Sequence, residues 1–390
     1  IRDSSGGHTV EYRRLGRTGL TVSVLGMGGG YLMLLEQELG TQLYERAFER
    51  GVNYFDGRYG DSSVKLRPVI KRDRARCVVG SKTADPTAKG AMARVEEDLA
   101  ILETDYLDVY YLRCYSHEML EERLAPGGPF EGLVKARHQG KIRAIGMANH
   151  SDPSVLVAGI ETGLVDVVIF PLNVVRRDAL ATLIPVAQEH DVGLVVMKPL
   201  SVGKLPAHLA LRWLRTQPIH TIAAGMSALQ HLEIDLAAVE QEPAALSAGE
   251  KAEAERIRQA RAHTREACRL CQDLCQSVCE QKLPIPHMIH TDVLHEHYRN
   301  LGLEAFLEYP LTAWAKKSIE RHFVERLERA RACTHCGLCE EQCPQGVPIM
   351  DLLEQMLEDH PPLIAAVQER GWQEQHADAV YPFQSRRGQR

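Results

Sequence analysis

The sequence lacks any apolar run close to the roughly 20 residues that a transmembrane helix needs. It also lacks a basic excess, because 46 Lys and Arg residues face 52 Asp and Glu residues and the formal net charge is −6. The opening stretch, Ile1 to Val10, is short and polar and does not have the pattern of a signal peptide. These absences predict a cytoplasmic protein that binds neither membranes nor nucleic acids.

Low-complexity tracts are missing too, and no G-x-G-x-x-G motif follows any predicted strand. The missing motif argues against a doubly wound sheet that binds a dinucleotide at its first turn. The composition is that of an ordinary soluble globular protein, with 44% hydrophobic and 25% charged residues among 390. This length accommodates one large domain and one smaller domain.

Short apolar runs alternate with amphipathic segments from about residue 21 to residue 226. The runs are rich in Val, Ile, Leu and Tyr, which is typical of parallel strands buried on both faces. We predict eight strands, at Thr21–Leu25, Val52–Asp56, Cys77–Ser81, Leu107–Leu112, Ile142–Met147, Val165–Phe170, Gly193–Met197 and Thr221–Ala224. Eight such units predict an α/β fold, a closed (β/α)₈ TIM barrel, across residues 11–262.

Cysteine, in contrast, is abundant near the C-terminus, where two runs hold eight of the ten cysteines. The second run is Cys333, Cys336, Cys339 and Cys343, followed by Pro344. Its C-x2-C-x2-C-x3-C-P spacing is that of bacterial ferredoxins. The first run, with one extra residue in its middle spacing, is Cys268, Cys271, Cys275 and Cys279. The two runs predict two [4Fe-4S] clusters in an all-helical, ferredoxin-like iron–sulfur domain over residues 263–380.

Two alternatives for these cysteines stay open. Each run could bind its own cluster, or the fourth cysteine of each run could cross to the other cluster, as in two-cluster ferredoxins. The crossed pairing would group Cys279 with the second run and Cys343 with the first. A pair of structural zinc sites is the other interpretation, although zinc sites usually combine two separate C-x2-C pairs. The remaining cysteines, Cys77 and Cys114, are predicted to be buried, inert thiols.

Polar side chains stand at the ends of the predicted strands, where (β/α)₈ barrels carry their active sites. They are Asp56, Lys82, Arg113, Asn149, Asn173, Lys198 and Ser227. Taken one at a time, each is more simply explained by a salt bridge or hydrogen bond at the rim. A Lys and an Asp on adjacent strands can also pair and tune a neighbouring phenol, and Tyr59 follows Asp56 closely.

Sequence blocks along the chain resemble the aldo-keto reductase family. The segment EYRRLGRTGLTVSV, residues 11–24, followed by LGMGGG, is similar to that family's opening hairpin and first strand. The blocks GVNYFD, YGDSS, GSKT, DYLDVYYL, IGMANH, MKPL and AAGMS follow in the family's order up to about residue 240. With its two cysteine runs, the chain resembles the iron–sulfur branch of the family, whose members contain a ferredoxin domain.

The resemblance implies a catalytic tetrad of Asp, Tyr, Lys and His, with NADPH as the hydride donor. In that family the Tyr protonates the substrate carbonyl, and the Lys and Asp lower the pKa of the Tyr. Asp56, Tyr59 and Lys82 fall in the matching blocks. The resemblance also assigns cofactor contacts, to Gly28, Asn149, Lys198, Gly225 and Ser227.

Departures from the family pattern concern the same site. Asp56 and Tyr59 are three positions apart, where the family usually has five. Arg113 replaces the family's His, and since Arg keeps its proton it cannot share the acid–base work, although it can hold a carboxylate or an oxyanion. Ala148 and Ile169 replace two residues that contact the nicotinamide in the family. The use of NADP(H) or NAD(H) is therefore an open question.

Three functions are compatible with these residues. The favoured one is an oxidoreductase, in which Asp56, Tyr59, Lys82 and Arg113 act on a small carbonyl or alcohol substrate. An anionic substrate is one version of this hypothesis. Two [4Fe-4S] clusters would pass electrons to that site or to a redox partner protein. Alternatively, the barrel has lost catalysis and serves as an electron-transfer or scaffold subunit. In the third, the barrel pocket performs acid–base chemistry without a nicotinamide.

Overall fold

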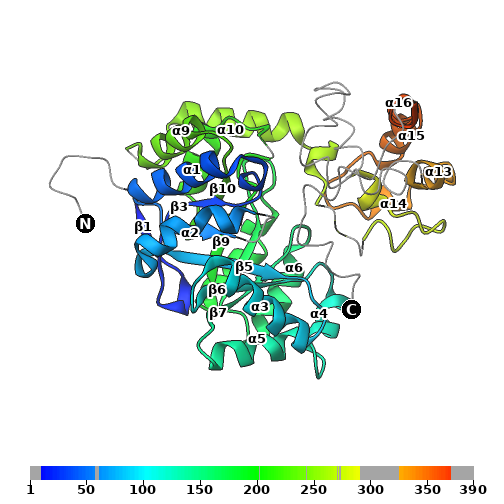
Figure 1. The fold of residues 1–390 in the computed structure, drawn as a ribbon. Helices are drawn as coiled ribbons and strands as arrows, with labels where there is room; N and C mark the ends of the chain where they lie inside the picture. Colours follow the sequence, from blue (N-terminus) through cyan, green and yellow to red (C-terminus); the bar gives the residue numbers. More distant parts are fainter. Residues whose placement is uncertain are drawn as a thin grey trace. The chain divides into compact units, whose positions relative to one another are not determined.

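The computed structural model describes two compact units, Ile1–Ala260 and Arg261–Arg390 (Figure 1). The described residues are 10–57, 61–201, 203–242, 244–269, 271, 274–289 and 325–369. The division lies close to the domain boundary expected from the sequence at residues 262 and 263. Within these described ranges, no helix is both long enough and apolar enough to cross a membrane.

Eight parallel strands close into a barrel in the order β10-β3-β4-β5-β6-β7-β8-β9. They are β3 (Leu25–Gly28), β4 (Tyr54–Asp56), β5 (Val78–Thr83), β6 (Leu107–Arg113), β7 (Ile142–Ala148), β8 (Val167–Pro171), β9 (Gly193–Met197) and β10 (Thr221–Gly225). The predicted α/β barrel is therefore confirmed. A closed sheet excludes the doubly wound alternative, because an open sheet has two unpaired edges.

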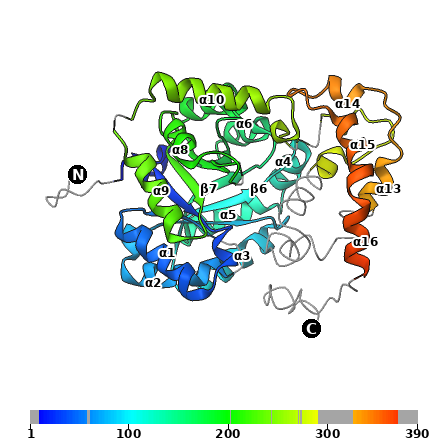
Figure 2. The ribbon, with the colours of Figure 1, turned by 90° about the horizontal axis from the view of Figure 1, so that it is seen from above.

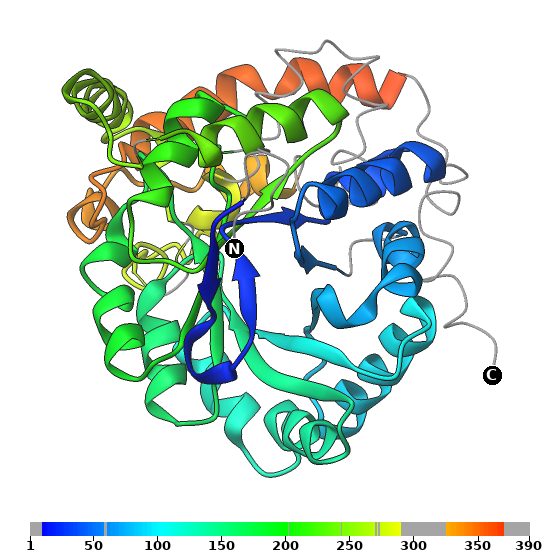
Figure 3. The ribbon, with the colours of Figure 1, turned by 90° about the vertical axis from the view of Figure 1, so that its left-hand side faces the viewer.

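An antiparallel hairpin of β1 (Tyr12–Arg14) and β2 (Thr21–Ser23) precedes the barrel. Viewed along the barrel, this dark blue hairpin crosses the near end (Figure 3). Leu15 and Val22 are fully buried in the cluster of side chains that fills the barrel interior, so the hairpin closes that end. The predicted first strand, Thr21–Leu25, was wrong in its extent, because Thr21–Ser23 pairs in the hairpin and the barrel strand begins at Leu25.

Helices surround the barrel and cover the outer face of its strands. They are α1 (Gln37–Glu49), α2 (Ser62–Arg72), α3 (Ala88–Leu102), α4 (His117–Leu124), α5 (Pro129–His138), α6 (Pro153–Glu161), α7 (Leu183–Glu189), α8 (Ala207–Arg215), α9 (Leu229–Glu240) and α10 (Ala248–Arg261). Helix α1 lies between α2 and α9 and contacts both (Figure 2). Their apolar faces and the outward side chains of the strands form the larger of the two barrel cores.

The described part of the second unit consists of short helices and turns. Its helices are α13 (Arg326–Ala330), α14 (Leu338–Glu341), α15 (Ile349–Asp359) and α16 (Pro361–Glu369). A separate hydrophobic cluster, which includes Leu283, Met288, Leu353 and Met356, packs between the two cysteine runs. Residues 290–324 and 370–390 lie outside the described ranges, so the predicted extent of this domain to residue 380 and its ferredoxin-like character stay predictions.

Candidate active site and cysteine cavities

Asp56 and Lys82 form a buried ion pair at the C-terminal ends of β4 and β5. The Lys82 Nζ lies 2.8 Å from the Asp56 Oδ2, and the two side chains are 2% and 4% exposed respectively. Asp56 pairs in register with Gly80, so Lys82, two residues further along β5, projects from the same face one step nearer the rim. A buried pair of this kind costs desolvation free energy, which makes it a better indicator of chemistry than of stability.

Two tyrosines lie beside this pair in the barrel interior. The hydroxyls of Tyr54 and Tyr111 are 2.7 Å apart, and the Lys82 Nζ is 5.8 Å from the centroid of the Tyr111 ring. Burial raises the pKa of Tyr111 well above its ordinary value, so this phenol is neutral. Tyr59 lies outside the described residues, and its role as proton donor stays a prediction. Among the described residues, the Asp56 Oδ1 has no hydrogen-bond partner.

The next strand ends present an arc of basic groups that we call the cationic arc: Lys82, Arg113, His150, Arg176 and Lys198. They stand at or just after β5, β6, β7, β8 and β9, which are consecutive neighbours in the barrel. The charges of Lys198, Lys82, Arg113 and Arg176 all reach His150. After burial, which is the largest cause, they lower the pKa of His150 well below its ordinary value. His150 is therefore a neutral imidazole at pH 7.

Lys198 has an unusual backbone conformation and a lowered pKa. Its φ of 55° lies in the left-handed region, which non-glycine residues adopt at a cost of about 1–3 kcal/mol. Its carbonyl accepts hydrogen bonds from the Asn173 Nδ2 at 3.1 Å and the Ser201 N–H at 3.1 Å, which hold this conformation. Burial, and then the charge of Arg176, lower the pKa of Lys198 to about 8.

Asn149 has a structural task that the sequence did not reveal. Its Nδ2 donates to the carbonyl of Cys114 at 2.8 Å, and its Oδ1 accepts from the N–H groups of Ser151 at 2.6 Å and Asp152 at 2.9 Å. The amide therefore fixes the loop after β7. Its oxygen is fully used, and one Nδ2 N–H is left that a nicotinamide carboxamide could accept from.

Gly28 and Gly225, two other predicted cofactor contacts, are neighbours in register on β3 and β10. A Cβ on Gly225 would lie 2.4 Å from the Cδ2 atom of Tyr31, so the Tyr31 ring occupies the space that a side chain would fill. Ser227 lies just beyond β10, and its hydroxyl is 3.3 Å from the His231 Nδ1. The cofactor roles of these residues stay predictions.

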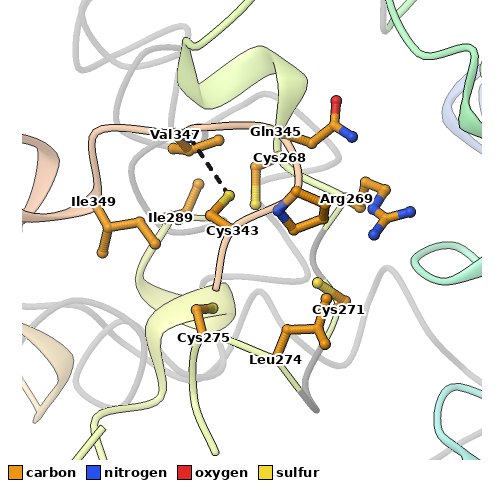
Figure 4. A pocket seen from close by; sticks show the side chains of 11 residues that line it. Cys268, Arg269, Cys271, Leu274, Cys275, Ile289, Cys343, Gln345, Val347 and Ile349 are labelled. Carbon is orange, nitrogen blue, oxygen red and sulfur yellow. Dashed lines mark hydrogen bonds between the residues drawn. The ribbon is translucent and has the colours of Figure 1, made fainter. Parts of the chain in front are cut away.

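The second unit contains a cavity around four sulfur atoms, with about 330 Å³ of empty volume, part of it open to solvent. Its cysteines are Cys268, Cys271, Cys275 and Cys343 (Figure 4). Burial, and then the neighbouring thiols, raise the pKa of Cys275 to about 12. The backbone N–H of Val347 donates to the Cys343 Sγ at 3.4 Å, shown as the dashed line in Figure 4.

A second cavity of similar size, about 360 Å³ of empty volume, lies at the other cysteine group. Its cysteines are Cys279, Cys333, Cys336 and Cys339. Cys336 is exposed and Cys339 is buried, and burial is the main cause that raises the pKa of Cys339 to about 11. Each cavity thus combines three cysteines of one run with the fourth of the other, which is the grouping of the crossed alternative.

Neither cysteine group has the geometry of a single-ion site. Among the described residues, no group of three or more His, Cys, Asp or Glu side chains is arranged to hold one metal ion. A tetrahedral zinc ion needs its sulfur ligands about 2.3 Å from one point.

Two residues of the cationic arc, His150 and Arg176, were missed by the sequence reasoning. His150 follows β7 by two residues, a position that continues the inward face of Ala148. Arg176 lies in the loop after β8, where its Nη1 donates to the carbonyl of His150 at 2.9 Å and its Nε lies 3.7 Å from the Asp178 Oδ1. Reading each loop two or three residues past its strand could have found His150, whereas Arg176 is placed by the tertiary fold.

Comparison with known proteins gives consistent matches for the barrel. The family model described as Aldo/keto reductase family matches residues 25–207. The chain is 25% identical over 229 residues to L-galactose dehydrogenase of Arabidopsis thaliana, covering 54% of this chain and 71% of that protein. It is 25% identical over 209 residues to an aldo-keto reductase of Mycobacterium avium, covering 48% of this chain and 71% of the relative.

A solved structure agrees in fold. The holo form of an aldo-keto reductase from Bacillus halodurans superposes with a TM-score of 0.54 at 21% identity, covering 64% of this chain and 96% of that one. The barrel therefore has the fold of the aldo-keto reductases. The barrel is thus similar to the aldo/keto reductase family in sequence and to one of its solved members in fold. The iron–sulfur branch stays a prediction, since the family match ends before the cysteine runs.

Proposed function

We propose that the protein is an oxidoreductase that converts a small anionic carbonyl or alcohol at the barrel rim. We also propose that its second unit holds two [4Fe-4S] clusters that exchange electrons with that site or with a redox partner protein. The observation that carries the enzymatic part is the buried Asp56–Lys82 pair at the C-terminal rim. Active sites of this fold form at that rim, and buried charged pairs cluster at functional sites.

Each rim residue has a role in this proposal. Lys82, held by Asp56, would lower the pKa of the Tyr59 phenol, which would donate the proton to the substrate oxygen. Arg113 would bind the negative oxygen of the substrate, because its guanidinium keeps its charge at working pH. A nicotinamide, when bound, would supply the hydride for the carbonyl carbon.

The donor sets in the second unit fit two iron–sulfur clusters. The crossed grouping would assign Cys268, Cys271, Cys275 and Cys343 to one cluster and Cys279, Cys333, Cys336 and Cys339 to the other. Such clusters transfer single electrons, and N–H groups that donate to the sulfur atoms tune their potentials, as Val347 would through Cys343.

Anaerobic purification with iron and sulfide analysis tests this proposal. We expect about eight iron and eight sulfide per chain, and a visible spectrum that bleaches on reduction. Titration with NADPH and with NADH should then change the cluster absorbance if a nicotinamide feeds the relay. Zinc in place of iron would overturn the cluster assignment, and an unchanged spectrum with both nucleotides would overturn the nicotinamide version.

A second candidate function is acid–base chemistry in the barrel without a nicotinamide. The observation that favours it is the Asn149 amide, which is already engaged by three backbone groups. In this case, activity should survive removal of the clusters by a chelator under air, and it should not depend on added nucleotide. Loss of activity together with the clusters would exclude it.

A further inference from the structure

We propose that the barrel mouth binds a dicarboxylate, with one carboxylate at Arg113 and the other at Lys198. This inference rests on the proposed function, since the dicarboxylate would be the substrate of the same site. It goes further by naming the substrate class and by giving Lys198 a role in substrate specificity. The argument uses the partners of each cation, their order around the barrel and the backbone of Lys198.

The cations of the arc differ in whether the protein neutralises them. Lys82 is paired with Asp56, and Arg176 interacts with Asp178 and donates to the carbonyl of His150. Arg113 and Lys198 have no carboxylate or carbonyl acceptor for their side chains in the part of the chain that the structure describes. Two partly buried cations without counter-charges are costly, and an anionic ligand would offset that cost.

The position of Arg113 suits a carboxylate beside the reacting carbon. Its register partner is Ala148, which lines the barrel interior, and its Nε atom is buried without a hydrogen-bond partner among the described residues. Tyr111, two residues earlier on β6, pairs in register with Lys82. Arg113 therefore stands one layer nearer the rim than the Asp56–Lys82 pair, on the adjacent strand. A planar guanidinium there can bind a carboxylate through two parallel hydrogen bonds.

The position of Lys198 suits a second carboxylate of the same ligand. In the barrel order, β9 lies three strands from β6. Neighbouring strands are about 4.8 Å apart, so the two strand ends are separated by roughly 14 Å along the wall. The two cations therefore stem from well-separated strand ends, and a short chain with a carboxylate at each end can offer a separate carboxylate to each of them. The strained backbone at Lys198 supports a functional reason for its placement.

Neutral His150 follows β7, which lies between the strands of Arg113 and Lys198 in the barrel order. An uncharged imidazole can donate or accept a hydrogen bond to the polar middle of a ligand without adding to the positive charge. A nucleotide pyrophosphate is the other chemistry that a cationic arc could attract. The Asn149 amide favours the substrate, because its oxygen is already used by two backbone N–H groups and only one N–H is left for a nicotinamide carboxamide.

Isothermal titration of the anaerobic full-length protein with pyruvate and with 2-oxoglutarate tests the inference. We expect 2-oxoglutarate to bind at least about tenfold more tightly, because it alone has one carboxylate for each cation. Lys198→Gln should weaken 2-oxoglutarate by about tenfold and leave pyruvate nearly unchanged, whereas Arg113→Gln should weaken both. Arg143→Gln is the matched control, since Arg143 is an exposed cation on β7 that pairs with Asp108.

Three results would overturn the inference: equal affinity for the two acids, an equal effect of Lys198→Gln on both, or displacement of 2-oxoglutarate by ADP. The last would assign the arc to a nucleotide. Circular dichroism of each variant separates misfolding from lost contacts, and Lys198→Arg should restore binding if the charge is what matters. Binding without cluster-linked turnover would overturn only the proposed function. Cluster-linked turnover without dicarboxylate binding would overturn only this inference.

Discussion

Asp235 on α9 is a buried acid with no evident chemical task. Its side chain is 2% exposed, and among the described residues its Oδ2 has no hydrogen-bond partner. Burial raises its pKa from 3.8 to about 7. The folded state thus keeps a proton that the unfolded chain releases above pH 4. Because the native state binds more protons, this group lowers stability progressively as the pH rises from about 4 to 7.

Asp235→Asn should remove that penalty, since the amide never ionises. The substitution changes the free energy of unfolding relative to the wild-type protein. We expect this change to be about 2–3 kcal/mol more stabilising at pH 8 than at pH 5. Urea denaturation at the two pH values measures the difference. Glu189→Gln, on the exposed surface of α7, is the control and should show no such dependence. A constant effect of Asp235→Asn at both pH values would contradict the prediction.

Lys198 predicts a pH dependence for anion binding. Burial and the charge of Arg176 lower its pKa to about 8, while His150 nearby is already neutral. Above pH 8, free protein loses the Lys198 proton, and 2-oxoglutarate affinity should fall. Lys198→Arg should remain flat up to pH 9.5 because guanidinium keeps its charge. Calorimetric titrations at pH 7 and 9 measure this, and a flat profile in the wild-type protein would contradict it.

At the scale of elements, one lysine joins two helices and a loop. Lys65 of α2 is completely buried, and its Nζ donates to the carbonyls of Leu32 at 2.8 Å and Leu35 at 2.6 Å and to the Asp61 Oδ1 at 2.9 Å. The three donors of the ammonium are all used. Its stem passes Gly40 of α1, where a Cβ would lie only 2.5 Å from the Lys65 Cδ.

Lys65→Met should therefore leave two carbonyls and a carboxylate without their donor. The expected loss is about 2–4 kcal/mol in the free energy of unfolding, measured by urea denaturation. Lys71→Met is the matched control on the same helix, because the Lys71 side chain is 62% exposed and should cost less than about 1 kcal/mol. Equal effects of the two substitutions would show that the buried hydrogen bonds of Lys65 contribute nothing.

The elements differ in how well the sequence predicts them. Gly193–Met197 was predicted with the bounds that the structure has, because a buried parallel strand leaves a local apolar run. Thr21–Ser23 has the same local character, yet its partner is β1, which only the tertiary fold decides. Asn149 and Arg176 show the same limit within the site, since side-chain bonds to backbone groups depend on how each loop closes.

For the whole molecule, the crossed cysteine grouping predicts how iron content responds to paired substitutions. Cys268→Ser with Cys343→Ser should remove ligands from one cavity only and leave about four iron per chain. Cys268→Ser with Cys279→Ser should remove one ligand from each cavity and leave almost none. Iron and sulfide analysis after anaerobic reconstitution distinguishes the two. The reverse result would show that each run binds its own cluster, and Cys77→Ser is the control outside both cavities.

Each cavity combines cysteines from both runs, and this fixes when its set of thiols is complete during synthesis of the chain. Cys343 lines the cavity of the first run, and it leaves the ribosome long after Cys268, Cys271 and Cys275. A nascent chain that has just exposed the first run carries an incomplete set of thiols. The first cavity is complete only after Cys343 has been made, so a cluster there would be loaded after the whole barrel sequence has been synthesised.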